Sequence, residues 1–163
     1  EEMYSTPLDS IDELVSFTDS SHGGEKPMMG EVHFLADGPV DWRAGRHTST
    51  AISATEGEYI AASRAAMTTM ALDRVVAFLF QVHGPRRPTV LFCDNLAAVM
   101  LSDSNITSKR VKHVMTRLAY LRERVAENSI YLYHVGTKGQ VADIMTKTLP
   151  TGTFHELRTL LLN

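Results

Sequence analysis

The stretch TVLFCDNLAAVM, residues 89–100, is the most informative part of this chain. Its first residues, 89–92, are β-branched or apolar, as in a buried strand, and an apolar helical pattern resumes at residues 96–100. Asp94 and Asn95 lie between the two patterns. Either residue can cap the helix, because its side-chain oxygen accepts a hydrogen bond from a free backbone N–H group. Alternatively, a carboxylate where a strand of an α/β sheet ends can line a site. The choice depends on whether other acids occupy matching positions.

The remaining apolar patterns predict an α/β fold. Alternating residues separated by turn residues indicate strands, and a period of 3.6 indicates helices. Strands are predicted at residues 14–18, 31–36, 48–52, 89–93 and 130–135. A hairpin turn at DGP, residues 37–39, leads from the strand at 31–36 into a further strand that ends at residue 42. Helices are predicted at residues 55–82, 96–101, 111–125, from about 141, and at 154–162. Strands followed by alternating helices and strands favour a mixed sheet with helices on both faces.

Length and composition indicate one globular domain. The chain has 163 residues, of which 44% are hydrophobic and 21% charged. We expect a polar lead-in at residues 1–13 and a single domain at residues 14–163. The formal net charge is −3, so any surface that binds nucleic acid must be local. Cys93 is the only cysteine, which excludes an internal disulfide and a zinc site built from cysteines.

The sequence shows no sign of export or membrane insertion. The longest apolar run, residues 75–80, is too short to span a bilayer, and no charged-then-apolar leader opens the chain. We therefore expect an intracellular location, in a cytoplasmic particle, the nucleus or an organelle, and no membrane partner. The first residue is Glu1 rather than Met, which suggests a fragment of a longer protein.

Four acids fall at comparable places in this layout. Asp19 ends the first strand, Glu58 lies one turn into the long helix, Asp94 ends the strand at 89–93, and Asp143 begins the helix after the last strand. Clustered carboxylates are costly unless a cation neutralises them, and ligands that are all oxygen favour Mg²⁺ or Mn²⁺. Two such ions about 4 Å apart can activate a water and stabilise the leaving oxygen in phosphodiester hydrolysis. Sequence spacing permits this cluster without proving it.

Five ordered blocks of the sequence carry a family resemblance. They read ELVSFTDSSHGG (13–24), SATEGEYIAASRAA (53–66), LFCDNLAAVMLS (91–102), SKRVKHV (108–114) and GQVADIMTKTLP (139–150). In this order and at similar intervals they resemble the motifs L-x-G-Y-(S/T)-D-A-D-W-A-G, S-S-T-E-A-E-Y-x-A, C-D-N-x-(S/A)-A, T-K-H-I and Q-x-A-D-x-x-T-K-x-L-P. These are motifs of the ribonuclease H domain of copia-type retrotransposon polyproteins. The resemblance runs from about residue 14 to the C-terminus. It implies a five-stranded mixed sheet whose first three strands are antiparallel, with helices on both faces.

The resemblance implies a catalytic and metal-binding tetrad of Asp19, Glu58, Asp94 and Asp143. The glutamate requires a choice, because Glu56 is also available. Ribonuclease H helices carry alanines three and seven residues after the catalytic glutamate, and these positions hold alanine after Glu58 but tyrosine and serine after Glu56. We therefore assign Glu58, and interpret Glu56 as an acid favoured by the helix dipole. Asp94 is then expected to bind metal while its neighbour caps the helix.

Two departures from the family pattern concern the same site. The family's D-A-D-W reads Asp19-Ser-Ser-His here, so the second acid and the tryptophan are missing while the first acid remains. Many ribonucleases H also use a histidine in a mobile loop before the last aspartate. His134 lies nine residues before Asp143, but the alignment of YHVGTKGQVAD places it within a strand. We therefore expect it to have a structural role.

The densest basic stretch of the chain is the candidate for nucleic-acid contact. Composition alone is equally compatible with a solvated helix face. Ribonucleases H, however, hold their substrate with the region before the last strand, and phosphates attract lysine and arginine. We therefore expect nucleic acid to be bound by Asn95, beside the metal site, and by Lys109, Arg110, Lys112 and His113.

The resemblance implies an endonuclease that cleaves the RNA strand of RNA–DNA hybrids during retrotransposon reverse transcription. The expected cofactors are two Mg²⁺ ions, with Mn²⁺ as a substitute, and the expected partners are the hybrid and an adjoining reverse-transcriptase domain. Recognition would rest on the shape of the hybrid and on the 2′-OH. An alternative is a domesticated copia-derived domain that acts as a structural or interaction subunit of a larger assembly. A third possibility, a DNA-directed nuclease or integrase, is disfavoured by the matching blocks.

Overall fold

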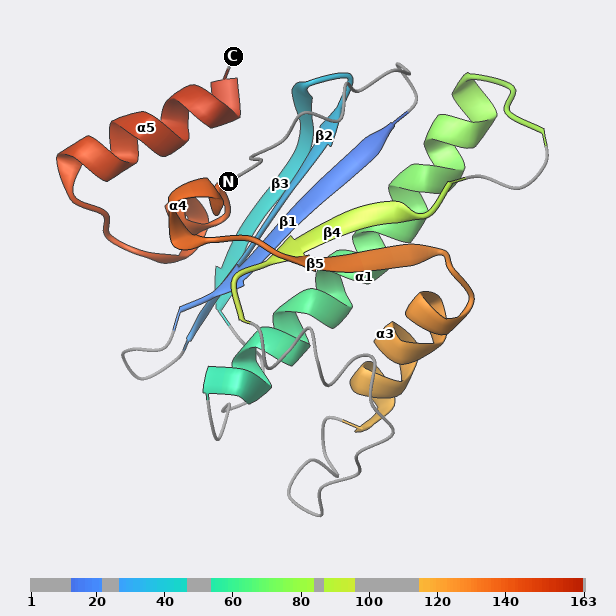
Figure 1. The fold of residues 1–163 in the computed structure, drawn as a ribbon, viewed down its shortest axis with the longest axis horizontal. Coiled ribbons are helices and arrows are strands. Elements are labelled where there is room, and N and C mark those ends of the chain that lie inside the picture. The colour runs from blue at the N-terminus through green and yellow to red at the C-terminus, as the bar shows by residue number, and fades with distance from the viewer. Residues whose placement is uncertain (1–12, 22–26, 47–53, 84–86, 96–114, 163) are drawn as a thin grey trace.

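The computed structural model describes residues 13–21, 27–46, 54–83, 87–95 and 115–162. Five strands form one sheet in the order β3-β2-β1-β4-β5, namely β1 (Leu14–Ser20), β2 (Met28–Leu35), β3 (Gly38–Arg46), β4 (Thr89–Cys93) and β5 (Ile130–His134). The pairs β1–β2 and β2–β3 are antiparallel, whereas β1–β4 and β4–β5 are parallel (Figure 1). The predicted mixed sheet with three antiparallel strands first is confirmed.

Helices cover both faces of this sheet, as the sequence predicts. One face packs against α1 (Ala54–Leu79), beside which lies α3 (Met115–Ala126). On the other face, α4 (Asp143–Thr146) packs on β1, β2 and β3, and α5 (Thr151–Leu162) contacts β3 (Figure 1). A short 3-10 helix, Thr137–Gly139, connects β5 to the segment that leads into α4.

Small side chains let α1 lie close to the sheet. Ala62, Ala65 and Ala66 are fully buried and pack with Leu91 and other apolar residues of β4, β5 and α3. Alanine also has the highest helix propensity, so the same residues favour the helix and its close packing. The contact fixes the position of the N-terminal turns of α1, which carry Glu58, relative to the ends of β1 and β4.

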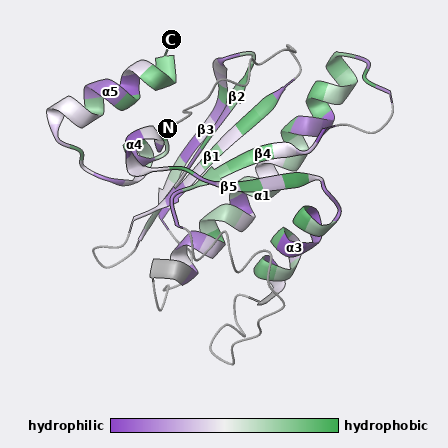
Figure 2. Cartoon of the chain, in the orientation of Figure 1, coloured by the Kyte–Doolittle hydropathy of each residue, from purple (hydrophilic) through white to green (hydrophobic). Residues whose placement is uncertain are grey.

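The opposite face of the sheet has an aromatic core. Phe17 of β1 stacks on Phe92 of β4 with ring centroids 4.9 Å apart, and meets Phe34 of β2 edge to face at 5.8 Å. Val141 and Met145 pack against this group from the segment around α4. Figure 2 shows hydrophobic residues along β1, β4 and β5. The apolar contacts anchor α4 over β2 and its two neighbours, β1 and β3.

The β2–β3 turn differs from the prediction by one residue. Its two central residues are Ala36 and Asp37, with φ angles of 49° and 65°, and β3 already begins at Gly38. Two consecutive positive φ angles are typical of a tight hairpin turn. The sequence DGP suggested a turn at 37–39 because proline and glycine are frequent turn residues. The proline is instead the second residue of β3, which is an edge strand and so tolerates it.

Other boundaries differ modestly, and some predictions cannot be compared. The long helix ends at residue 79 rather than 82, and the helix expected from about 141 begins at Asp143. The strand predicted at 48–52 and the helix predicted at 96–101 lie outside the described residues. Within the described part of the chain, no helix is both long and apolar enough to cross a membrane.

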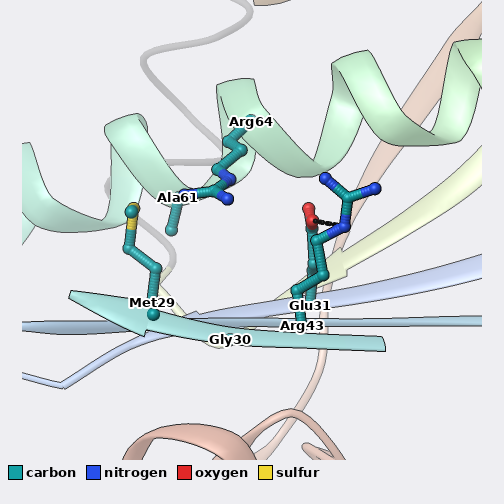
Figure 3. Close-up of a pocket in the computed structure, with 7 residues that line it drawn as sticks. Met29, Gly30, Glu31, Arg43, Ala61 and Arg64 are labelled. Atoms are coloured by element: carbon teal, nitrogen blue, oxygen red, sulfur yellow. Dashed lines mark ion pairs between the residues drawn. The ribbon is translucent and has the colours of Figure 1, made fainter. Parts of the chain in front are cut away.

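A small hollow lies between α1 and the β2–β3 hairpin (Figure 3). Glu31 projects from β2 into it and is paired with Arg43 of β3, whose Nε lies 3.6 Å from Oε1. Thr68 of α1 donates a hydrogen bond of 3.2 Å to the same carboxylate oxygen. The Glu31 carboxylate is therefore already neutralised and hydrogen-bonded, and the hollow is structural rather than a candidate for catalysis.

Candidate metal centre

The parallel pairing of β1 with β4 brings Asp19 and Asp94 to one edge of the sheet. Thr18 pairs with Cys93, so Asp19 and Asp94 are the next residues on two adjacent strands that run in the same direction. Asp19 is fully buried, whereas the side chain of Asp94 is 19% exposed. The carboxyl ends of parallel strands meet in this way at a common edge, where sites of α/β proteins are found.

Helix α1 contributes Glu58 from the α1 side of the sheet. Glu58 lies in the second turn, is 6% exposed, and has its Oε2 3.9 Å from the Cys93 thiol, which donates to it. It is close enough to Asp19 and Asp94 for their charges to raise its pKa. Glu56, in the first turn, is only half-buried. The geometry therefore favours the predicted choice of Glu58.

Helix α4 contributes Asp143 from the opposite face, and Gly30 of β2 lets it approach. A Cβ atom at Gly30 would lie 2.7 Å from Cβ of Met145 and 2.9 Å from the carbonyl oxygen of Ala142. Only a residue without a side chain permits this contact. Because Gly30 pairs with Asp19 across the β1–β2 ladder, the close approach places Asp143 beside Asp19.

The four predicted acids form two overlapping groups of possible ligands. Carboxylate oxygens of Asp19, Asp94 and Asp143 lie within 4.8 Å of one another, and so do ligand atoms of Glu58, Cys93 and Asp94. Asp94 belongs to both groups. The structure thus brings together all four residues that the sequence indicated, from β1, α1, β4 and the start of α4.

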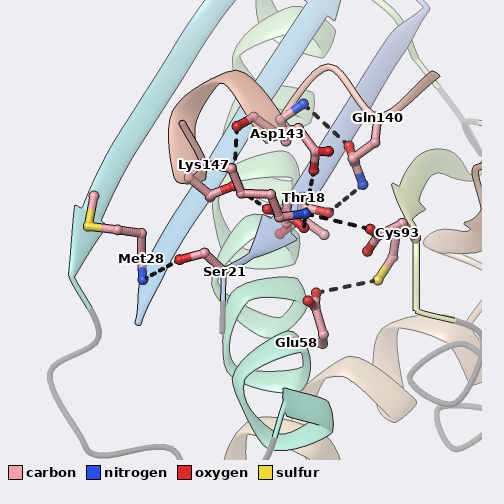
Figure 4. A network of polar contacts seen from close by, with 12 residues as sticks. Thr18, Ser21, Met28, Glu58, Cys93, Gln140, Asp143 and Lys147 are labelled. Carbon is pink, nitrogen blue, oxygen red and sulfur yellow. Dashed lines mark hydrogen bonds and ion pairs between the residues drawn. The ribbon is translucent and has the colours of Figure 1, made fainter. Parts of the chain in front are cut away.

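Lys147, which is not among the residues predicted for the site, lies among three of these acids (Figure 4). Its Nζ is 2.7 Å from Oδ1 of Asp143, 3.1 Å from Oδ1 of Asp19 and 3.9 Å from Oδ2 of Asp94. The sequence did contain a signal: Lys147 follows Asp143 by four residues, the spacing that brings two helical side chains together. We will call Lys147 and the four acids the carboxylate cluster.

Two further polar residues hold the frame of this cluster. Thr146 donates its hydroxyl to Oδ2 of Asp19. Gln140, fully buried, donates from Nε2 to the carbonyl oxygen of Thr18 at 2.9 Å and accepts from the backbone N–H of Ala142 at 3.3 Å (Figure 4). Gln140 therefore ties the end of β1 to the start of α4. Both residues belong to the GQVADIMTKTLP block, but their partners are far away in sequence and spacing cannot reveal them.

Burial and crowding keep several of these acids from ionising easily. Burial raises the pKa of Glu58 to about 9, and the charges of Asp19 and Asp94 add to the shift. Burial also raises the pKa of Asp94 and of Asp143. The Lys147 ammonium lowers both pKa values but does not cancel the effect of burial. A single ammonium therefore leaves the cluster short of positive charge.

The donor set fits hard divalent cations. All four acids offer oxygen, the ligand atom that Mg²⁺ and Mn²⁺ prefer, and the deficit of positive charge favours a doubly charged ion. Cys93 is a poor competitor, because burial and the nearby Glu58 charge raise the pKa of its thiol and keep it protonated. Asp19, Glu58, Asp94 and Asp143 would hold the ions.

The predicted nucleic-acid contacts remain predictions. Residues 109–113 lie outside the described part of the chain. Asn95 is half-buried directly after Asp94, at the rim of the cluster. His134 is the last residue of β5, within a strand as expected, but its side chain is exposed, and its charge lowers the pKa of Asp94. It therefore does not pack in the core.

Comparison of sequences finds similarity to retrotransposon polyproteins. The chain is 29% identical over 146 residues to the retrovirus-related Pol polyprotein from transposon TNT 1-94 of Nicotiana tabacum, covering 87% of this chain and 11% of that protein. It is 28% identical over 148 residues to the corresponding polyprotein from transposon RE1 of Arabidopsis thaliana, covering 87% and 10%. It is also 29% identical over 157 residues to the Ty1-LR3 Gag-Pol polyprotein of Saccharomyces cerevisiae, covering 93% and 9%. The chain thus spans about a tenth of these relatives. No protein-family model matches it.

Comparison of structures finds similarity to ribonuclease H1. The crystal structure of LC11-RNase H1 in complex with RNA/DNA hybrid matches with a TM-score of 0.57 and 15% identity, over 82% of this chain and 94% of that one. RNase H1 from the halophilic archaeon Halobacterium salinarum matches with a TM-score of 0.59, also at 15% identity and with the same coverage. The resemblance that the five blocks predict is therefore confirmed: this chain has the ribonuclease H fold, and its sequence is similar to retrotransposon Pol polyproteins.

Proposed function

We propose that this chain is a ribonuclease H that hydrolyses the RNA strand of RNA–DNA hybrids, as part of a longer retroelement polyprotein. The observation that carries the proposal is the convergence of Asp19, Glu58, Asp94 and Asp143 from four elements of a ribonuclease H fold. The sequence similarity to Pol polyproteins supports the retroelement context, and an adjoining reverse-transcriptase domain is part of the proposal.

The acids of the cluster would hold two Mg²⁺ ions, for which Mn²⁺ could substitute. When bound, two such ions activate a water and stabilise the leaving oxygen of a phosphodiester. The chain itself contributes the placement of the carboxylate ligands. Asp94, which belongs to both ligand groups, would hold an ion together with Asp19 and Asp143 in one group and with Glu58 in the other. Gln140 and Thr146 fix Asp19 and the start of α4, so the ligands keep their geometry.

A ligand set of this kind needs Asp94 for the chemistry but not for the fold. We expect the wild-type chain to cleave a labelled RNA–DNA hybrid in Mg²⁺ and to lose cleavage in chelator. Asp94→Asn should lose cleavage by at least about a hundredfold, the scale of losing one catalytic electrostatic contact. Its thermal melting temperature in chelator should be equal or higher, because a repelling charge is removed.

Single-stranded RNA, double-stranded RNA and double-stranded DNA serve as substrate controls in the same assay. Cleavage of DNA duplex in preference to hybrid would contradict the assignment and favour a DNA-directed nuclease of the same fold. Full activity of Asp94→Asn on hybrid would contradict the assignment of Asp94 and the other acids as metal ligands. A folded chain that binds Mg²⁺ and hybrid without cleaving either strand would favour the structural or interaction subunit.

A further inference from the structure

The carboxylate cluster contains its own cation. Lys147 donates to Oδ1 of Asp143 at 2.7 Å and to Oδ1 of Asp19 at 3.1 Å, and its Nζ lies 3.9 Å from Oδ2 of Asp94. These three acids are also the group whose oxygens lie close enough to share one metal ion. The ammonium thus lies against the same three carboxylates that could hold an ion.

The ammonium and a divalent ion cannot occupy this position together. Mg²⁺ binds its oxygen ligands at about 2.1 Å. An ion bound to Oδ1 of Asp19 and Oδ1 of Asp143 would take the volume that the Nζ atom fills, and the two positive charges would repel each other strongly at this distance. Binding of metal at these oxygens therefore requires that Lys147 leave them.

The local structure allows Lys147 to leave. Helix α4 ends at Thr146, and Lys147 has an extended backbone with φ −129° and ψ 148°. Its side chain is 34% exposed, whereas those of Asp19 and Asp143 are 0% and 2% exposed. A flexible four-carbon stem beside solvent can turn the ammonium outward while the buried carboxylates stay in place. The hydrogen bond from Thr146 to the other oxygen of Asp19 does not depend on the lysine.

We infer that Lys147 is a built-in counter-ion that competes with the metal, so that it stabilises the metal-free cluster and lowers the affinity for Mg²⁺. This inference rests on the proposed function of the cluster as a metal site. It goes beyond that function by assigning to one residue the control of metal occupancy. The apparent dissociation constant rises by the inverse of the fraction of molecules in which the competing ammonium is absent.

The test compares Lys147→Met, which keeps the length of the side chain without its charge, with Lys147→Arg, which keeps the charge. Lys138→Met is the matched control, because it removes the same charge from an exposed position on the nearby 3-10 helix. Mg²⁺ binding to each chain is measured by isothermal titration calorimetry at pH 8 and constant ionic strength. Thermal melts with chelator and with saturating Mg²⁺ provide a second measurement.

We expect Lys147→Met to bind Mg²⁺ about tenfold more tightly than wild type does, if the Lys147 ammonium lies against Asp19 and Asp143 about nine-tenths of the time. It should also melt at a lower temperature in chelator and gain more from Mg²⁺ than wild type does. Lys147→Arg and Lys138→Met should bind Mg²⁺ within about twofold of wild type. If Lys147→Met is too unstable in chelator, Lys147→Gln gives the same comparison, because its amide can still donate to Asp143.

Equal or weaker Mg²⁺ binding by both uncharged Lys147 variants would overturn the inference, because a lysine that supports the ligands rather than competing would give that result. The proposed function would survive this outcome if wild type still bound Mg²⁺ and cleaved hybrid. A wild-type chain that binds no Mg²⁺ would instead overturn both the metal site and the role of Lys147.

Discussion

At the scale of single residues, the choice between Glu56 and Glu58 can be tested directly. Glu58 is buried beside Asp19 and Asp94, whereas Glu56 is half-buried in the first turn of α1. Glu58→Gln should therefore abolish hybrid cleavage, while Glu56→Gln should keep most of it. Both changes replace a carboxyl group of the same helix with an amide, so each controls for the other. The reverse result would show that the wrong glutamate has been assigned.

The pKa of Glu58 also predicts how the metal-free fold responds to pH. The pKa is raised from 4.5 to about 9, mainly by burial and then by the charges of Asp19 and Asp94. Between these values the folded chain holds a proton that the unfolded chain has released, so the stability contributed by this group is complete below pH 4.5 and is lost as pH rises through 9. Glu58→Gln cannot ionise and escapes that loss.

Thermal melts in chelator from pH 4.5 to 9 measure this effect. The melting temperature of Glu58→Gln should match wild type at the acid end and exceed it by at least about 3 °C at pH 8, on the usual scale for a chain of this size. Glu56→Gln should follow the wild-type curve. A constant difference between Glu58→Gln and wild type at every pH would mean that ionisation of Glu58 does not limit stability.

At the scale of elements, the contact between β2 and α4 is the critical one. A Cβ atom at Gly30 would lie 2.7–2.9 Å from Met145, Thr146 and the carbonyl oxygen of Ala142. Gly30→Ala must push α4 away from the sheet, and α4 carries Asp143. We expect a loss of about 1–3 kcal/mol of unfolding free energy, which is the usual cost of overpacking. Cleavage should fall by more than stability alone explains, because a misplaced ligand is costly.

Gly45→Ala is the control for this change. Gly45 lies on the neighbouring strand β3, opposite Met29, and a Cβ atom there would meet nothing within 4 Å. The substitution should therefore leave melting temperature and cleavage close to wild type. Thermal melts, Mg²⁺ titrations and hybrid cleavage of both variants separate general strand effects from displacement of α4. Equal behaviour of the two alanine variants would contradict the close approach.

The sequence could predict the acids but not the contacts that position them. Asp94 was recognisable because it follows an apolar strand, and Asp143 because it begins a helix in a family-like block. The role of Gly30 and the partner of Thr146 depend on how closely α4 approaches the sheet, which is set by tertiary packing and leaves no periodic signal. The position of Lys147 depends in the same way on Asp19 and Asp94, which are distant in sequence.

At the scale of the whole molecule, the mixed sheet with its first three strands antiparallel could be predicted because five ordered sequence blocks resemble those of a known fold family. Burial alternates along β1 and β4, with one set of residues packed under α1 and the other forming the aromatic core. The turn at Ala36 and Asp37 could not be placed from the residues DGP, because the register of the two strands decides which residues take positive φ. Local turn propensity is weaker than strand pairing.

The net charge of −3 raises the question of how this molecule would hold an anionic hybrid. We predict that Lys109, Arg110 and Lys112 supply local positive charge, by contact with backbone phosphates. Replacing all three by glutamine should weaken hybrid binding and reduce the slope of log affinity against log salt by up to about three, one for each lost phosphate contact. The cleavage rate at saturating hybrid should change little, since none of the three is a proposed metal ligand.

The control for this prediction is the pair Arg86 and Arg87, which is also basic and follows the long helix. Their replacement by glutamine should leave affinity and its salt slope unchanged, because composition there indicates only a solvated turn. Fluorescence anisotropy with labelled hybrid, between about 50 and 200 mM salt, covers the range in which phosphate contacts are most sensitive. If the 109–112 variant binds hybrid like wild type at every salt concentration, the basic stretch is a solvated surface. The hybrid would then be held by other residues of this chain or by the adjoining domain that we propose.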